Sequence, residues 1–473
     1  MPGTTLSPAV PTARTGHRPV LVLATLLSCQ LMLVLDATVM NVALPRIQSE
    51  LGFSATGLSW VMNAYTLVFG GLLLLGGRAG DLFGRRRMFV AGITLFTVAS
   101  LVGGFADSPG WLLTARVVQG IGGAAAGPST IALLTTTFTE PRARIRALAL
   151  FSGMSSAGFA VGLIAGGLLT QWLSWRSVMF INVPFGFAAA VLATRFVAEP
   201  ERRPARLDLP GAMTATGGVA ALVYGFIRAA SEGWSDGPTL LSLVAGAILL
   251  VTFVAIQARS AAPMMPLRLF ADRNRASAYL NFFLGPMAAM STFFFLSQYL
   301  QKVHGFDALG TGFAFLPMAL LVFTISRLIP RLLPRFGPKP LALAGTTAMV
   351  AGLVLLSRLG VASDYFPALF LPMVLMGLGM GLAFAPLNVI IMATVSDHDA
   401  GAAGGVLQTM QQTGATLGLA VLVTVFGTAT RHATGSPSQM LVAGMTPAFA
   451  ASAAIAGVAF LVALTFRRVL PQS

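Results

Sequence analysis

The chain has 473 residues, of which 56% are hydrophobic and only 10% are charged, and its mean hydropathy is +0.81. A soluble protein of this length could not keep so apolar a surface in water, so we predict an integral membrane protein. The net charge of +15 does not indicate nucleic acid as a partner. Nucleic-acid binding needs basic residues clustered on a folded surface with aromatic side chains, whereas here they punctuate apolar segments.

The residues that usually carry catalytic or metal chemistry are scarce. A single cysteine, Cys29, excludes an intramolecular disulfide. All four histidines fall outside the apolar runs, so no buried metal cluster can be assembled from them: His17, His304, His398 and His432. We therefore expect no metal and no cofactor. An enzyme is not expected either, because the apolar runs hold no His/Glu cluster, no Cys/His pair and no second acid.

The first apolar run, residues 19–44, contains one charged residue, Asp36. The run is longer than a signal-peptide core and no cleavage site stands out at its end, so we expect a retained helix. Asp36 would lie roughly 12 Å from a helix end at Leu44, within hydrocarbon depth. A charge there is costly without a partner or water, and taking up a proton lowers that cost. Asp36 is a candidate proton carrier; the alternative is an aspartate that merely bonds a neighbouring helix.

The remaining apolar runs of about 20 residues complete a prediction of fourteen transmembrane helices. Five of them follow the first run, beginning near Gly57, Arg87, Trp111, Arg146 and Arg176. A linker rich in charge and proline, residues 199–208, precedes two spans at roughly 209–229 and 238–258. The last six begin near Arg275, Gly310, Pro340, Phe366, Gly404 and Met445, and the least clear boundary is at 386–397.

The distribution of positive charge predicts the orientation. With the N-terminus in the cytoplasm, 23 of the 30 Lys and Arg residues fall in cytoplasmic segments and Arg116 lies inside the fourth span. Outer loops hold the other six: Arg46, Arg176, Arg228, Lys302, Arg358 and Arg431. The positive-inside rule therefore favours a multi-pass protein of the cell membrane with both termini in the cytoplasm.

An internal repeat indicates two related halves. Residues 52–57, before the second span, resemble residues 305–310 before the tenth, and the offset of 253 recurs for 83–86 and 336–339. Residues 120–122 and 377–379 match at an offset of 257. We predict a six-helix bundle in 1–206, an inserted two-helix hairpin in 207–262 and a second six-helix bundle in 263–473. Parallel halves around a central cavity are a transporter architecture.

The short loop between the second and third spans combines glycines with charges. Its glycines permit a tight turn and close approach. An acid there can cap a helix or pair with an arginine across the seam between the halves, which would stabilise one conformation. The candidate gate comprises Gly77, Gly80, Asp81, Gly84, Arg85 and Arg86. The alternative is that the arginines merely follow the positive-inside rule.

Further polar and glycine residues lie inside the spans. An unpaired guanidinium at Arg116 would be costly, so Arg116 either controls the proton on a nearby acid or is tied to backbone carbonyls. The fifth span has a smooth stripe for close helix packing: Gly158, Gly162, Gly166 and Gly167. Candidates for lining a substrate cavity, or for joining helices instead, are Asn41, Asn63, Tyr65, Gln119, Asn281, Gln298, Gln408, Gln411 and Gln412.

Together these residues resemble the major facilitator superfamily, and within it the fourteen-helix drug:proton antiporter family. Four stretches carry the resemblance in order over nearly the whole chain: 35–45, 77–87, 116–120 and 175–184. It implies that Asp36 is the proton-linked carboxylate, that Arg116 takes part in coupling, and that Asp81 with its arginines forms the cytoplasmic gate. The chain departs from the family pattern at Leu163, where a proline is usual, and at Leu82, where an arginine is common.

The resemblance implies a transporter driven by the proton gradient. We expect a monomer in the lipid bilayer that exports a small amphipathic substrate, for which a cation is one candidate, in exchange for protons by alternating access. The alternative within this fold is a dedicated exporter of one endogenous metabolite or antibiotic. A non-coupled channel and a membrane receptor are the alternatives outside it.

Overall fold

The computed structural model describes residues 19–201, 207–393, 395, 399–431 and 433–466. His17, His398, His432 and part of the predicted linker at 199–208 lie outside these ranges. The described chain is helical throughout its regular structure, and fourteen helical segments are long and apolar enough to cross a membrane. The prediction of an all-helical membrane fold with fourteen spans is confirmed.

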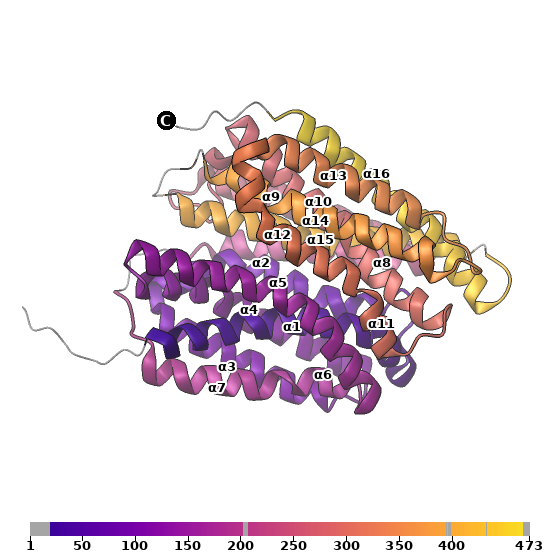
Figure 1. The fold of residues 1–473 in the computed structure, drawn as a ribbon, viewed down its shortest axis with the longest axis horizontal. Helices are drawn as coiled ribbons and strands as arrows, with labels where there is room; N and C mark the ends of the chain where they lie inside the picture. The colour runs from indigo at the N-terminus through magenta and orange to yellow at the C-terminus, as the bar shows by residue number, and fades with distance from the viewer. Residues whose placement is uncertain (1–18, 202–206, 394, 396–398, 432, 467–473) are drawn as a thin grey trace, which may run out of the picture.

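The first part of the chain forms one bundle (Figure 1). Its helices are α1 (Pro19–Leu51), α2 (Ser59–Phe83), α3 (Arg85–Gly104), α4 (Pro109–Thr137), α5 (Pro141–Trp172), α6 (Arg176–Phe180) and α7 (Asn182–Phe196). The last two form a single span. Apolar side chains such as Met32, Phe89 and Phe96 fill part of the bundle core.

The last part of the chain forms a second bundle beside the first (Figure 1). It begins with the short helix η1 (Leu267–Phe270) and continues with α10 (Arg273–Lys302), α11 (Ala308–Ala314), α12 (Leu316–Phe336), α13 (Pro338–Leu356), η2 (Tyr365–Leu369), α14 (Phe370–Met392), α15 (Ala400–Thr430) and α16 (Pro437–Leu464). One span comprises α11 and α12, and another η2 and α14. The stretch 386–397, the least clear boundary in the sequence, contains the end of α14.

The helix α1 is longer than the sequence suggests. It continues past Leu44 to Leu51, with Pro45 inside it. Proline removes one backbone hydrogen bond, but neighbouring helices can satisfy the freed groups inside a membrane protein. In the turn before Pro45, the Val42 carbonyl accepts a hydrogen bond of 3.0 Å from Gln301 Nε2 of α10. This side-chain bond ties the region around the proline to α10, and the helix continues through Pro45.

The helices run between two ends of the molecule, which we name after residues near them. The Asp81 end contains the turn between α2 and α3, and the Glu50 end contains the end of α1. At the Glu50 end, Asn41 Nδ2 donates to the Phe293 carbonyl at 3.0 Å, and Lys302 Nζ contacts Gln48 Oε1. Polar contacts between α1 and α10 therefore join the two bundles on this side.

The bundles meet along two seams. In one, α2 packs on α15, and the Thr416 hydroxyl donates to the Thr66 hydroxyl at 2.9 Å. In the other, α5 packs on α11 and α12, where a Cβ at Gly312 would lie 2.5 Å from the Leu163 carbonyl oxygen. Because Gly312 has no side chain, α11 can approach α5 this closely.

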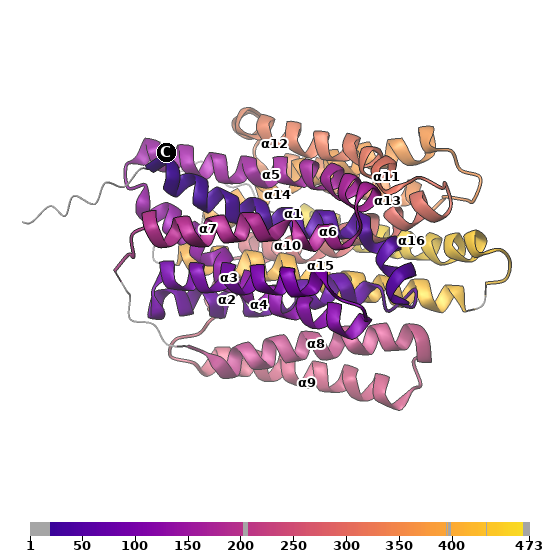
Figure 2. The same cartoon turned by 90° about the horizontal axis from the view of Figure 1, so that it is seen from below.

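A helical hairpin covers the first of these seams. It consists of α8 (Leu209–Glu232) and α9 (Gly237–Arg259). Val223 of α8 belongs to one apolar cluster with Leu67 of α2 and Ala420 of α15. Figure 2 shows the hairpin beside α2, on the opposite side of the molecule from α5 and α12. Within the described part of the chain, the α5–α12 seam therefore has no such cover.

Candidate functional site

The Asp36 carboxylate is fully buried in the first bundle and accepts three hydrogen bonds. Arg116 Nη1 lies 2.5 Å from Oδ2, and both side chains are 0% exposed. Gln119 Nε2 donates to Oδ1 at 3.1 Å, and Asn182 Nδ2 donates to the same oxygen at 2.9 Å. Three donors, one of them charged, stabilise the ionised carboxylate at this depth.

The Arg116 guanidinium is held by groups of α2 and α4 as well as by the aspartate. Its Nε donates to the Val61 carbonyl at 3.0 Å, and its Nη1 donates to Gln119 Oε1 at 2.9 Å. The guanidinium carbon lies 4.5 Å from the centre of the Tyr65 ring. Arg116 therefore contacts both an acid and a backbone carbonyl, and its control of the proton on Asp36 stays a prediction. Nη2 has no hydrogen-bond partner among the described residues.

Five helices converge on this ion pair, α2 among them through Val61. Asp36 comes from α1, Arg116 from α4 and Asn182 from the start of α7, while Ser100 of α3 accepts a 2.7 Å hydrogen bond from Gln119. Close approach of α4 to α2 depends on Gly120, where a Cβ would lie 2.9 Å from the Tyr65 carbonyl oxygen. Apart from Arg116 Nη2 and Asn182 Oδ1, which have no partner among the described residues, the polar groups of this cluster bond one another inside an apolar bundle.

The second bundle has no equivalent ion pair at the repeat positions. The offset of 253 relates Asp36 to Ala289, and the offset of 257 relates Arg116 to Met373. Both equivalents are buried in a large apolar cluster. The two halves therefore share a fold but differ in chemistry, and only the first bundle places an acid at this position.

Three of the predicted cavity residues in the first bundle are buried. Asn41 bridges to α10 through Phe293, and Tyr65 packs against Arg116. Asn63 is 0% exposed, and neither atom of its amide has a described partner. In this conformation Asn41 and Tyr65 belong to helix interfaces, and Asn63 is enclosed within the bundle.

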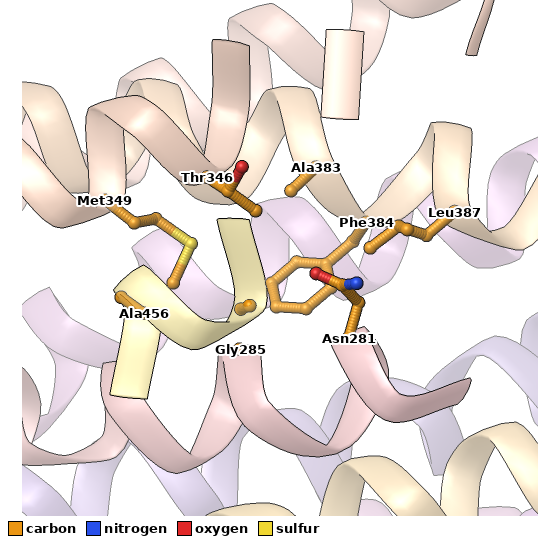
Figure 3. A pocket seen from close by; sticks show the side chains of 9 residues that line it. Asn281, Gly285, Thr346, Met349, Ala383, Phe384, Leu387 and Ala456 are labelled. Atoms are coloured by element: carbon orange, nitrogen blue, oxygen red, sulfur yellow. The ribbon is translucent and has the colours of Figure 1, made fainter. Parts of the chain in front are cut away.

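The predicted cavity residues of α10 lie inside the second bundle. Asn281 and Gln298 are each 2% exposed, and Gln298 donates to the Phe294 carbonyl of its own helix at 3.3 Å. Asn281 borders a very small pocket of about 10 Å³, and its amide oxygen has no partner among the residues described. Figure 3 shows its side chain close to Phe384 and Leu387, with Thr346 and Met349 on the far side of the pocket.

The three glutamines of α15 are half-buried. Gln412 lies in the α2–α15 seam, because a Cβ added at Gly70 of α2 would lie 2.6 Å from the Gln412 Cβ. Gln408 and Gln411 occupy the same helix towards the Asp81 end, partly exposed. Gln412 thus lies where the two bundles meet, and none of the three amides is among the groups that bond Asp36.

The gate residues are organised within the first bundle. Asp81 Oδ1 lies 2.8 Å from Arg85 Nη2, so the partner that the sequence left open is an arginine four residues away and not one across the seam. The turn depends on Gly84, whose φ of +107° favours glycine. Glu199, which sequence reasoning missed, accepts the backbone N–H of Arg86 at 3.1 Å. Gly77 and Gly80 lie against α4, near Pro128 and Ser129 respectively.

The glycine stripe of α5 packs in two directions. Gly158, Gly162 and Gly166 face α1, and a Cβ at Gly166 would lie 2.9 Å from Val39 Cα. Gly167 faces α11 instead, with a Cβ position 2.7 Å from the Ala308 carbonyl oxygen. The helix runs unbroken through Leu163, where the family pattern has proline.

Similarity to known proteins agrees with this architecture. The family model described as Major Facilitator Superfamily matches residues 26–419. The chain belongs to the major facilitator superfamily. Within the superfamily it belongs to the fourteen-span drug and antibiotic export family, as its curated relatives indicate. It is 43% identical to the puromycin resistance protein of Streptomyces alboniger, over 85% of this chain and 81% of that protein.

Other members of the superfamily extend the comparison. The chain is 38% identical to the cephamycin export protein of Amycolatopsis lactamdurans, over 92% of this chain and 91% of the relative. The tetracenomycin C resistance and export protein of Streptomyces glaucescens is 33% identical to the chain, over 83% of this chain and 73% of that protein. Among solved structures, a peptide transporter in complex with sulfate has a TM-score of 0.67 at 15% identity, covering 94% of each chain. That likeness shows the major facilitator fold alone.

Proposed function

We propose that this transporter exports small toxic molecules, antibiotics among them, in exchange for protons by alternating access. The observation that carries the proposal is the buried Asp36–Arg116 pair, a titratable acid and its counter-charge inside a membrane bundle. The relatives' names describe resistance and export proteins, which supports the direction of transport. The gate residues and the α5 glycine stripe would serve the movement of the bundles.

Protonation of Asp36 would change the internal contacts of the first bundle. A neutral carboxyl group no longer offsets the guanidinium charge, so Arg116 would rely on Val61 and Gln119 instead. The helix α1 carries Asp36 and also contacts α10 through Asn41, five residues further on. A shift of α1 on protonation would therefore reach the second bundle directly. In this mechanism proton and substrate interact through α1 and do not compete for one binding site.

The orientation follows from the distribution of charge. The positive-inside rule places the Asp81 end and both termini in the cytoplasm of a cell-membrane protein. The α1–α10 contacts at the opposite end would keep the outer side closed while substrate enters from the cytoplasm. We propose a monomeric transporter whose substrates are amphipathic, with a cation as one candidate. Half-buried Gln408 and Gln411 are then candidates for contact with substrate.

One embedded acid suggests one proton per cycle. A pH difference of one unit supplies about 1.4 kcal/mol per proton, and 100 mV supplies about 2.3 kcal/mol per net charge. A monovalent cation exchanged for one proton moves no net charge and would respond only to the pH gradient. A neutral substrate would respond to both, so the voltage dependence of transport reports the substrate charge.

The test uses purified protein in proteoliposomes with puromycin and a cephamycin as probes. With a pH gradient, the wild type should accumulate at least one probe, and Asp36→Asn should abolish this uphill accumulation. Asp36→Glu is the matched control, because it retains an acid. Substrate counterflow without a gradient reports whether each variant is folded and binds its probe. Full pH-driven accumulation by Asp36→Asn would refute the proton role of Asp36.

The second candidate is a dedicated exporter of one antibiotic. Several relatives are named for a single compound, such as puromycin or cephamycin, which favours this reading. A panel of cationic, neutral and anionic compounds would separate the two candidates. One compound transported far better than all others would favour the dedicated exporter, and similar rates across the panel would favour multidrug export.

A further inference from the structure

The exposed face of α12 changes abruptly from apolar to basic. Phe313 and Leu320, on α11 and α12, are 52% and 51% exposed, and Thr324 continues the same face. The next positions on this face, at helical spacings of three and four residues, are Arg327, Arg331 and Arg335, all exposed. Three arginines therefore follow one another towards the Asp81 end, on the side of α12 that is not packed on its own bundle.

The neighbouring helix presents two further arginines along the same seam. A Cβ at Gly153 of α5 would lie 3.8 Å from Arg327 Nη2, so this face of α5 turns towards α12. Arg146 and Arg142 lie seven and eleven residues before Gly153, which places them on the same face nearer the Asp81 end. Both are exposed. We call the five residues Arg142, Arg146, Arg327, Arg331 and Arg335 the arginine seam.

The arginine seam lacks counter-charges in the described structure. None of the six ion pairs formed by described residues includes any of its members. Membrane orientation accounts for basic residues near helix ends, such as Arg335. It does not account for Arg327, which lies about 14 Å inside the end of α12 at Phe336. The Arg327 guanidinium lies over the Phe323 ring, 4.8 Å from its centre, but this contact supplies no counter-charge. A guanidinium at that depth beside exposed apolar side chains still needs an anionic partner or contact with headgroups.

We propose that the arginine seam binds the headgroup of an anionic phospholipid from the leaflet at the Asp81 end. The hairpin α8–α9 covers the α2–α15 seam and leaves the α5–α12 seam open to lipid (Figure 2). A phosphate at Arg327 would place acyl chains along Leu320 and Phe313, the apolar part of the same face. This continuity of basic and apolar surface matches a lipid and not a soluble anion.

The site also has a consequence for the transport cycle, and this consequence alone rests on the proposed function. Five like charges on facing helices oppose the approach of α5 and α12 at the Asp81 end. A bound anionic headgroup offsets this repulsion. Anionic lipid therefore favours closure of the Asp81 end and should speed the step that follows substrate loading.

Binding is tested on the full-length purified protein by native mass spectrometry, titrated with phosphatidylglycerol or phosphatidylcholine. The wild type should retain phosphatidylglycerol in preference to phosphatidylcholine. Arg327→Gln/Arg331→Gln should weaken phosphatidylglycerol retention by about tenfold or more, since each arginine near the headgroups contributes to the attraction. The control is Arg195→Gln/Arg259→Gln, which removes two exposed arginines from the same end but outside the seam. It should change retention less than twofold.

Two results would overturn the proposal. Equal retention of both lipids by the wild type would do so even if the seam variant failed to fold, and so would equal weakening by the seam and control variants. Competition between the bound lipid and soluble glycerol phosphate is a further test. If it displaced the lipid at equal concentration, the seam would be a site for soluble anions and the lipid assignment would be wrong. Because binding is measured without transport, this outcome is independent of the proton-exchange proposal.

Discussion

At the scale of single residues, the buried pair of Asp36 and Arg116 is the most demanding feature of the molecule. Both side chains are 0% exposed, and the desolvation of two charges is offset by their mutual contact, by hydrogen bonds with Gln119, Asn182 and Val61, and by the Tyr65 ring beneath the guanidinium. Such a pair stabilises little as a whole, but loss of one partner leaves the other charge buried and unpaired. The two residues should therefore act as a unit.

A double-mutant cycle measures this coupling. Asp36→Asn and Arg116→Gln should each lower the free energy of unfolding by about 3–5 kcal/mol, because each leaves one uncompensated charge. The double variant should be more stable than the sum of the two effects predicts. Thermal unfolding of all variants in the same detergent would give the change in unfolding free energy for each single variant and for the double variant. Additive effects would mean that the two side chains do not interact as the structure has them.

Asn182 is predicted to position the carboxylate. Asn182→Leu removes one donor to Asp36 and should cost about 1.5–3 kcal/mol of stability, because the acceptor is charged. It should also reduce proton-driven transport while substrate counterflow persists. The matched control is Asn281→Leu, another buried asparagine, whose amide donates to Ser277 of its own helix. Equal loss of proton-driven transport in both variants would point to a general packing defect.

At the scale of helices, the contact between α5 and α1 depends on the absence of side chains. A Cβ at Gly162 would collide with the Thr38 hydroxyl, which already donates to carbonyls of its own helix. Gly162→Ala should therefore force the helices apart and lower the stability by about 1–3 kcal/mol. Gly457→Ala in α16 is the control, since no atom lies within 4 Å of that Cβ position. Unfolding temperatures that fall equally for both would contradict the packing role of the stripe.

The ends of the helices and the contacts in their turns could be predicted only in part from the sequence. The apolar run 19–44 predicted the first span, but its helix continues through Pro45 to Leu51, where it reaches the end of the molecule. The turn at Gly84 was predictable from its glycine and charges. The pairing of Asp81 with Arg85 was not, since arginines lie on both sides of the seam.

At the scale of the whole molecule, the contacts between α1 and α10 select one arrangement of the bundles. Asn41→Val with Gln301→Leu removes two hydrogen bonds that join the bundles at the Glu50 end. The double variant should open this end more often and expose the Asp81 end less. A cysteine at Gln411, in a Cys29→Ser background, would report this change through slower reaction with an impermeant thiol reagent from the Asp81 side.

The control for this experiment is Ser297→Ala, also in α10, which removes a buried hydroxyl that donates to the Phe294 carbonyl of its own helix. It should leave the labelling rate of the cysteine unchanged. An unchanged rate in the Asn41/Gln301 variant would mean that these two bonds do not hold the bundles. The hairpin α8–α9 would then be the main link, because it contacts α2 and α15 at once.

The sequence by itself determined the number of spans, the internal repeat and the identity of the costly residues. A bilayer requires about 20 apolar residues per crossing and penalises every charge within one, so both signals can be read along the chain. Tertiary structure decided what those residues touch. Asp36 meets Arg116 and Asn182 across separations of 80 and 146 residues. Such contacts depend on how each helix is rotated and tilted against its neighbours, which the apolar pattern of a single span does not specify.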